Sequence, residues 1–315
     1  MNRRLLTCAA WSGLLIAGIA GAQTVTKGIK GVVGEATPVV LVKEGFKATE
    51  GPLPQPDGGV LFTDNQSNQI VRIAPDGAIT AWFDNSGGAN ALTRMPNGDI
   101  VATLVGDKLI AVMKPGSPPR SLVNGYMGTP FNRPNDLVAS RRGDIYFTDT
   151  AAVGATGAAL PSALYQITET GELLRITTDI PRPNGVALSP DDDTLYVANT
   201  SGEYIIAFNV DRKGRVGKRR DDFAKLETPP PQNGAAPASG ADGIAVDEDG
   251  RLYVATTLGV QVLSAKGKPL GTIELPKTPQ NLAFAGPGRS ALYVVGRGSV
   301  FRIATLTHGP DREGK

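Results

Sequence analysis

The sequence is almost free of the two residue types that most often bind transition metals or act as nucleophile and base. It has 315 residues, with one cysteine and one histidine. Cys8 lies in an N-terminal segment that we expect to be removed, so the mature chain has no disulfide, no thiolate nucleophile and no cysteine-bound zinc or iron. His308 lies near the C-terminus, and only a return of this tail to the site would let it serve in a Ser-His-Asp triad. Any chemistry must therefore rely on oxygen and amide groups.

An excess of charge of either sign is also missing. Lys and Arg number 32 and Asp and Glu number 30, and removal of Arg3 and Arg4 with the leader would leave 30 of each. A neutral chain has no broad attraction for a phosphate backbone, so we expect no nucleic-acid partner. The sequence has neither a Gly-x-Ser-x-Gly nucleophile elbow nor a glycine-rich phosphate loop.

The N-terminal segment has the pattern of a secretion signal. Arg3 and Arg4 precede an apolar run from Leu5 to Ile19, and Ala20-Gly21-Ala22 is a small-residue cleavage pattern, so we expect the mature chain to start at Gln23. The apolar run of about 15 residues is shorter than the ~20 that span a bilayer. We expect a secreted or periplasmic protein with no membrane contact after cleavage. An uncleaved anchor is the alternative, and the choice between Sec and twin-arginine export stays open.

Internal repeats are the most informative feature. The 39 glycines and 24 prolines suit short strands and many turns better than long helices. Six times the chain repeats a polar residue, any residue and an apolar residue, then a turn, then a β-branched or aromatic strand. The six strands start at Val60, Asp99, Asp144, Thr194, Arg251 and Ala291, so consecutive starts lie 39, 45, 50, 57 and 40 residues apart.

A period of this length is typical of a four-stranded propeller blade. The sequence therefore predicts an all-β protein, a six-bladed β-propeller, in which Val39 to Phe46 closes the ring by completing the last blade. We divide the chain into a signal peptide (1–22), an N-terminal linker (23–36), the propeller (37–307) and a C-terminal tail (308–315).

One polar residue opens each repeat at an equivalent place: Glu50, Asn90, Asn135, Asn184, Asp242 and Gln280. We take the six strands as the first strands of the blades, placed around a central channel, so in equivalent blades these side chains converge near the propeller axis. An unpaired buried polar group costs ~1–3 kcal/mol, so six of them indicate a polar ligand. Two carboxylates and several amide oxygens suit a hard cation such as Ca²⁺. For any single Asn-Gly or Asp-Gly pair the alternative is a turn, which these residues commonly form.

These motifs resemble the SMP-30/gluconolactonase/LRE-like family of six-bladed propellers over roughly residues 37 to 305. The matching segments are Glu50-Gly51-Pro52, Asn132-Arg133-Pro134-Asn135-Asp136, Pro183-Asn184-Gly185-Val186-Ala187 with Ser189-Pro190-Asp191, and Ala241-Asp242-Gly243-Ile244-Ala245-Val246-Asp247. The resemblance implies one divalent cation on the axis, most often calcium, with Zn²⁺ and Mn²⁺ as alternatives. It implies the metal ligands Glu50, Asn135, Asn184 and Asp242, and a substrate contact at Arg133.

The family implies hydrolysis of a lactone as the activity, with a small-molecule sugar or related lactone as partner. A divalent cation polarises the lactone carbonyl. Asp242 is the candidate general base or water-positioning group, and direct nucleophilic attack by it is the alternative. Arg133, Asn90 and Gln280 are the candidate substrate-binding residues. Other readings are an organophosphate or other ester hydrolase, a non-enzymatic secreted binding module, and a strictosidine-synthase-like condensing enzyme. The oligomeric state stays open.

Two segments depart from the pattern of the family. Many members carry Pro-Pro-Tyr-Gly where this chain has Thr150-Ala151-Ala152-Val153 after Asp149, and the second repeat reads Ala102-Thr103-Leu104-Val105-Gly106 in place of a Glu-His-Gly segment. We expect both to alter the rim of the pocket and leave the metal site intact.

Overall fold

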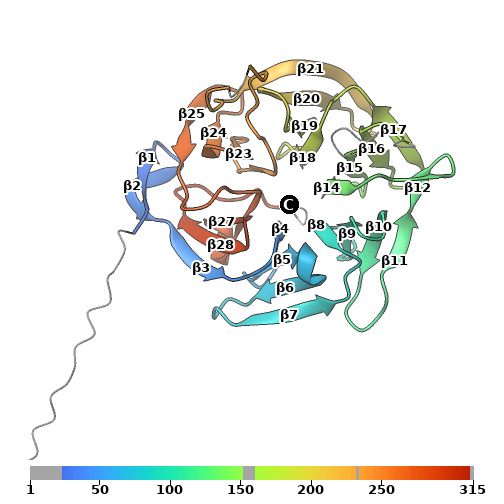
Figure 1. Ribbon diagram of the computed structural model, residues 1–315, viewed down its shortest axis with the longest axis horizontal. Helices are drawn as coiled ribbons and strands as arrows, with labels where there is room; N and C mark the ends of the chain where they lie inside the picture. The colour runs from blue at the N-terminus through green and yellow to red at the C-terminus, as the bar shows by residue number, and fades with distance from the viewer. Residues whose placement is uncertain (1–22, 152–159, 232–233, 313–315) are drawn as a thin grey trace, which may run out of the picture.

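The computed structural model describes residues 23–151, 160–231 and 234–312, and these form a ring of six four-stranded antiparallel sheets (Figure 1). The predicted all-β, six-bladed propeller is therefore confirmed. No α-helix occurs in the described residues, which contain two 3-10 turns, η1 (Asn65–Ser67) and η2 (Pro287–Arg289). Within the described residues, no helix is long and apolar enough to cross a membrane. The expected signal peptide, residues 1–22, lies outside the described part.

Each blade is built from strands that follow one another outward from the axis. The first three blades are β4 (Thr49–Pro54), β5 (Val60–Asp64), β6 (Gln69–Ile73) and β7 (Ile79–Asp84); β8 (Ala89–Arg94), β9 (Ile100–Leu104), β10 (Leu109–Met113) and β11 (Arg120–Val123); and β14 (Pro134–Ala139), β15 (Ile145–Asp149), β16 (Ala163–Ile167) and β17 (Leu173–Thr177). A small hairpin precedes the third blade, formed by β12 (Gly125–Tyr126) and β13 (Thr129–Pro130).

The other three blades continue the ring. They are β18 (Pro183–Leu188), β19 (Thr194–Asn199), β20 (Tyr204–Val210) and β21 (Val216–Lys225); β22 (Ile244–Val246), β23 (Leu252–Thr256), β24 (Gly259–Leu263) and β25 (Pro269–Ile273); and β26 (Asn281–Ala285), β27 (Ala291–Gly296), β28 (Ser299–Ala304) and β3 (Val40–Glu44). The strands β4, β8, β14, β18, β22 and β26 contact each other in that order and back to β4, so they surround the axis.

The ring is closed by the N-terminal strand, as the sequence predicts for Val39 to Phe46. β3 pairs antiparallel with β28, with Glu44 opposite Ser299 and Val40 opposite Arg302. The last blade therefore takes its outer strand from the start of the chain, which fixes the two ends of the propeller to each other.

The strand order within each blade corrects one interpretation. The strands that start near Val60, Asp144 or Thr194, which the sequence analysis takes as the first of each blade, are the second strands. The innermost strands contain the polar repeat residues themselves or, in the last two blades, start just after them. Asn184-Gly185 has the composition of a turn, but it lies in β18, and Glu50-Gly51 likewise lies in β4. Both pairs are extended because neighbouring blades approach closely at these positions.

Two glycines allow this approach. A Cβ atom added at Gly51 would overlap the carbonyl of Asn90 in the next blade, and one added at Gly185 would overlap the carbonyl of Asp242. Gly51 also has a positive φ of 48°, which other residues rarely adopt.

The core lies between blades, with one apolar cluster at each of the six junctions. Between the first two blades, for example, Leu53, Leu61 and Ile70 pack against Leu92 and Ala102. Since each sheet is covered on both faces, strands such as β5 are buried along their whole length. This packing holds the inner strands in fixed positions around the axis.

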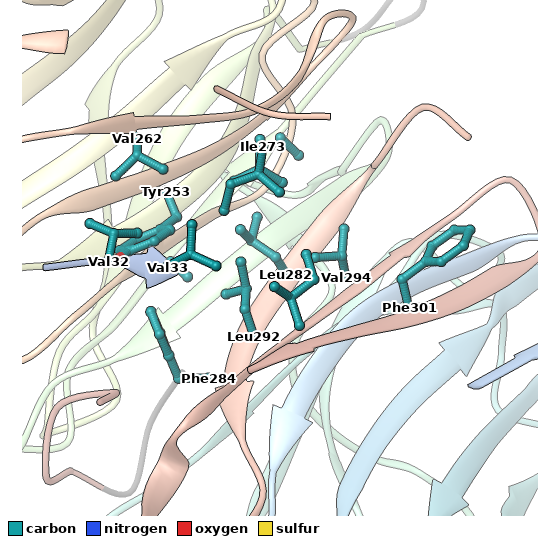
Figure 2. Packing of buried hydrophobic residues seen from close by; sticks show 14 of the residues in the cluster. Val32, Val33, Tyr253, Val262, Ile273, Leu282, Phe284, Leu292, Val294 and Phe301 are labelled. Atoms are coloured by element: carbon teal, nitrogen blue, oxygen red, sulfur yellow. The ribbon is translucent and has the colours of Figure 1, made fainter. Parts of the chain in front are cut away.

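The segment taken as a linker, residues 23–36, is structured. It forms most of a hairpin, β1 (Val25–Ile29) and β2 (Val33–Pro38), that lies against the fifth and sixth blades. Figure 2 shows Val32 and Val33 of this hairpin in the same apolar cluster as Tyr253. The hairpin therefore covers apolar surface of the propeller.

The described part of the C-terminal tail, residues 308–312, is also packed against the propeller. Arg312 is buried and pairs with Asp192 at 3.0 Å, and the guanidinium of Arg141 donates to the carbonyl of Asp311. Arg141 follows the end of β14, the inner strand of the third blade. The tail thus covers the end of the channel opposite to the start of the inner strands.

Candidate functional site

A cavity of about 440 Å³ lies where the inner strands start. It contains all seven residues that the sequence analysis selects: Glu50, Asn90, Arg133, Asn135, Asn184, Asp242 and Gln280. Its wall is completed by Ala48, Asn65, Gln66, Val105, Thr150, Ala151 and Arg182. The six polar repeat residues therefore converge on one cavity, as the sequence predicts. Their roles in binding and catalysis stay predictions.

Threonines from neighbouring blades fix the backbone beneath these side chains. The hydroxyl of Thr63 donates to the carbonyl of Asn90 at 2.8 Å, and Thr103 donates likewise to Asn135 at 2.8 Å. Thr148 repeats the contact with Asn184 at 2.7 Å. Since each carbonyl is bound to the preceding blade, the polar residue is held at the blade junction beside the cavity.

Carboxylate or amide groups at the ends of second strands fix the segments before the polar residues. The buried carboxylate of Asp149 accepts the backbone N–H groups of Asn132 at 3.0 Å and Arg133 at 2.7 Å. Asn199 accepts the N–H of Arg182 at 3.2 Å. Burial raises the pKa of Asp149, and these N–H donors oppose the rise. Sequence reasoning missed this role, although such residues end a strand in three repeats.

Neutral donors surround the carboxylate of Glu50. This side chain is 5% exposed and accepts the N–H of Gly51 at 3.2 Å and the amide of Asn281 at 3.1 Å. Gln280 donates to its other oxygen at 3.3 Å. These bonds orient the carboxylate of Glu50 at the wall of the cavity.

Amide groups form a connected chain along another part of the wall. Asn90 donates to the side-chain oxygen of Asn135 at 2.8 Å, and it accepts from Asn65 at 2.8 Å. Asn184 donates its amide to the hydroxyl of Thr200 at 3.1 Å, which leaves its oxygen for the cavity. The structure thus gives Asn90 the role of holding Asn135.

The donor set fits a hard cation. Among residues 23–151, 160–231 and 234–312, no three His, Cys, Asp or Glu side chains lie together as a metal-binding group. An ion in this cavity would therefore be held by two carboxylates, Glu50 and Asp242, and by the amide oxygens of Asn135 and Asn184. Oxygen donors of this kind suit Ca²⁺ better than Zn²⁺.

A second arginine joins the predicted Arg133 at the cavity. Arg182 lies two residues before Asn184, as Arg133 lies two residues before Asn135, and both segments read Arg-Pro-Asn. The resemblance to the family was drawn from Asn132 onward in the first segment but only from Pro183 onward in the second. The repeated tripeptide was the signal that could have identified Arg182.

The two segments that depart from the family pattern both reach the cavity. Val105 lines it from the second blade, and Thr150 and Ala151 line it after β15; residues 152–159 lie outside the described part. His308 pairs with Glu248 at 3.1 Å and is absent from the cavity wall. The described part of the tail therefore does not bring His308 to the cavity.

A family model described as the SMP-30/Gluconolactonase/LRE-like region matches residues 48–297. The chain belongs to this family. Among relatives of the SMP-30/gluconolactonase/LRE-like family, the gluconolactonase of Zymomonas mobilis is 28% identical over 305 residues, which are 88% of this chain and 84% of the relative. The pentonolactonase XacC of Haloferax volcanii is 24% identical over 271 residues, which are 82% of this chain and 84% of that protein.

Solved structures of the family have the same fold. A gluconolactonase from Xanthomonas campestris superposes with a TM-score of 0.77 at 25% identity, over 92% of this chain and 99% of that one. The calcium-binding protein regucalcin from Agrobacterium tumefaciens superposes with a TM-score of 0.72 at 20% identity, over 87% and 95%. The lactonases among these proteins support a hydrolase that acts on lactones, whereas regucalcin shows the fold alone.

Proposed function

We propose that this protein is a divalent-cation-dependent lactonase that opens a sugar or related lactone in the cavity on the propeller axis. The observation that carries the proposal is the meeting of both candidate carboxylates with two amide oxygens in one cavity. The protein belongs to a family that includes gluconolactonases, and this supports lactones as the class of substrate. Calcium is the cation we propose, because the donors are oxygens and a relative of the same fold is a calcium-binding protein.

The cation, when bound, polarises the lactone carbonyl and stabilises the oxyanion that forms there. Asp242 is partly exposed at the cavity wall, where a carboxylate oxygen can take the proton of an attacking water. The water oxygen then bonds to the carbonyl carbon, the ring C–O bond breaks, and the protonated Asp242 passes its proton to the ring oxygen; the new carboxylic acid releases its own proton to solvent. Arg133 and Gln280 orient the substrate, and Asn90 keeps Asn135 in place.

Direct attack by the carboxylate of Asp242 is the alternative route, and isotope labelling separates the two. Multiple turnovers in H₂¹⁸O place ¹⁸O in the side chain of Asp242 if it forms a mixed anhydride with the opened lactone that water then hydrolyses at the enzyme carboxyl. Mass spectrometry of the peptide that contains Asp242 is expected to show no label, because a general base exchanges only protons. A labelled peptide would make Asp242 the nucleophile.

A lactone panel with a metal readout tests the proposal. Purified protein is assayed for proton release from sugar lactones, before and after EDTA and after addition of Ca²⁺, Mn²⁺ or Zn²⁺. We expect hydrolysis that EDTA abolishes and Ca²⁺ restores, with one ion per chain by elemental analysis. Hydrolysis that EDTA leaves unchanged would overturn the metal dependence, and a wild-type protein that opens no lactone would overturn the activity.

A further inference from the structure

Two arginines occupy equivalent positions in adjacent blades at the mouth of the cavity. Arg133 precedes β14 and Arg182 precedes β18, and each is followed by a buried proline that starts the strand. Their backbone N–H groups are held in the same way, by Asp149 and Asn199. Equivalent backbone positions place both side chains on the same rim of the cavity.

Both guanidinium groups are available to a ligand. The side chains of Arg133 and Arg182 are exposed, and neither has a hydrogen bond or ion pair within the described part of the chain. Arg219 and Arg251, by contrast, are ion-paired: Arg219 contacts Asp179 and Asp221, and Arg251 contacts carboxylates of its own turn. At this cavity two exposed arginines face the same space.

The charge of the cavity points to an anion. Its charged residues are Glu50, Asp242, Arg133 and Arg182, so its formal charge is two negative plus two positive, or zero. With a divalent cation on the two carboxylates, as the proposed function requires, the cavity carries a net charge of two positive. A neutral sugar lactone would leave this charge uncompensated, whereas an anionic group on the substrate would offset part or all of it.

We infer that the substrate is an acidic lactone, with an anionic group at the end remote from the ring carbonyl. This inference rests on the proposed lactonase function. Arg133 and Arg182 bind that group, since two guanidinium forks match the paired oxygens of a carboxylate, phosphate or sulfonate. The lactone carbonyl then lies near Glu50 and Asp242, while the anionic end lies at the rim. A cavity of about 440 Å³ is at the lower end of the ~300–1,000 Å³ of small-molecule sites and suits one sugar ring.

Matched substrates test this specificity. D-glucono-1,5-lactone is compared with its 6-phosphate and with its 6-deoxy-6-sulfo analogue, and a glucaric acid lactone supplies the carboxylate. We expect kcat/KM for at least one anionic lactone to exceed that of the neutral lactone by 10-fold or more, and to fall as salt is added. The lactone with the largest advantage identifies the anionic group.

Variants assign the effect to Arg182. In Arg182→Gln the ratio of anionic to neutral kcat/KM is expected to fall by 10-fold or more, and Arg182→Lys is expected to retain part of it. Arg302→Gln is the control, because Arg302 is exposed on β28 and lies outside the cavity wall. An unchanged ratio in Arg182→Gln, or a wild-type preference for the neutral lactone, overturns the inference.

Calorimetry provides a readout that does not depend on turnover. Gluconate and 6-phosphogluconate, the products of the neutral and phosphorylated lactones, are titrated into calcium-loaded protein. The phosphorylated acid is expected to bind at least 10-fold more tightly to wild type, and this advantage is expected to be lost in Arg182→Gln. 6-Deoxy-6-sulfogluconate and glucarate are titrated in the same way, and the arginine site is contradicted if none of the three doubly anionic acids binds more tightly than gluconate. Hydrolysis of neutral lactones alone would leave the proposed function standing, whereas absence of all lactone hydrolysis would remove it.

Discussion

Asn135 illustrates how one side chain of the cavity is positioned. Its backbone carbonyl accepts from Thr103 and from the amide of Asn90, and its side-chain oxygen accepts from Asn90 as well. These bonds come from the second blade, although Asn135 belongs to the third. An oxygen held from a neighbouring blade is preorganised, so little ordering would be needed if, as proposed, it binds a cation.

Arg133→Ala should impair turnover and leave the ion bound. Arg133 and Asn135 lie two positions apart on an extended segment, so their side chains share one face, and the longer arginine reaches beyond the metal ligand toward the substrate. We expect kcat/KM to fall ~10-fold or more, a loss of at least ~1.4 kcal/mol in transition-state binding. Steady-state kinetics and elemental analysis measure the two quantities, with Arg302→Ala as the control. Unchanged kinetics would make Arg133 a bystander, and loss of the metal would make it structural.

The repeat made the cavity residues predictable, because equivalent positions in a closed ring of blades face one axis. Glu50 and Gln280 were found this way although 230 residues separate them. Arg182 was missed because its segment was compared only from Pro183 onward. The hydrogen-bond roles of Asp149 and Thr103 could not be predicted, since they depend on which backbone groups the folded blades bring within reach.

The inner strands show where local preference and tertiary packing disagree. Asn184 and Gly185 favour a turn in isolation, yet they lie in β18 and are buried. The glycine has no side chain to separate two neighbouring blades, and its N–H donates to the carbonyl of Asp242 at 3.1 Å. The pair is therefore selected by the blade junction and not by a turn.

Gly185→Ala should destabilise the propeller. The new methyl group would overlap the carbonyl of Asp242, so the blades would have to separate, at a cost of about 1–3 kcal/mol. Gly217→Ala is the matched control, because Gly217 is exposed on β21 and a Cβ there makes only an ordinary contact at 3.7 Å. Thermal unfolding should show a lower Tm for the first variant alone. Equal melting temperatures would show that the junction at Gly185 is not tightly packed.

The sequence predicted that each blade has four strands and that an N-terminal strand closes the ring. The assignment of the strands near Val60 and Thr194 as innermost was wrong, because their continuous β-branched and aromatic runs are the strongest strand signal in the sequence. The β1–β2 hairpin was missed because residues 23–36 lie outside the repeat. It is stabilised by apolar contacts of Val32 and Val33 with the fifth and sixth blades, which no local pattern reveals.

At the scale of the whole molecule, closure and the buried junctions explain how a site can be built from side chains far apart in sequence. β3 and β28 join the two ends of the propeller, and the C-terminal tail covers the far end of the channel. The cavity at the near end is therefore the part of the axis where a small molecule is expected to enter. A closed ring also leaves no inner edge strand for pairing with other chains.

Export is expected to remove Met1 to Ala22, so the protein should start at Gln23 in a secreted or periplasmic fraction. The charged, apolar and small-residue regions of the leader carry this prediction. Intact-mass spectrometry of material from that fraction measures the start of the chain. A protein that begins at Met1 and sediments with membranes would show that the segment is an anchor.

The metal content of two charge-removing variants tests the central claim most directly. Glu50→Gln and Asp242→Asn each take one negative charge from the cavity while keeping the shape of the side chain, and Glu172→Gln does the same at an exposed position outside it. Calorimetric titration with Ca²⁺ and elemental analysis should show one ion per chain in wild type and in Glu172→Gln. Both cavity variants should bind Ca²⁺ at least 10-fold more weakly, a loss of ~1.4 kcal/mol or more. Wild-type calcium affinity in both cavity variants would contradict the account.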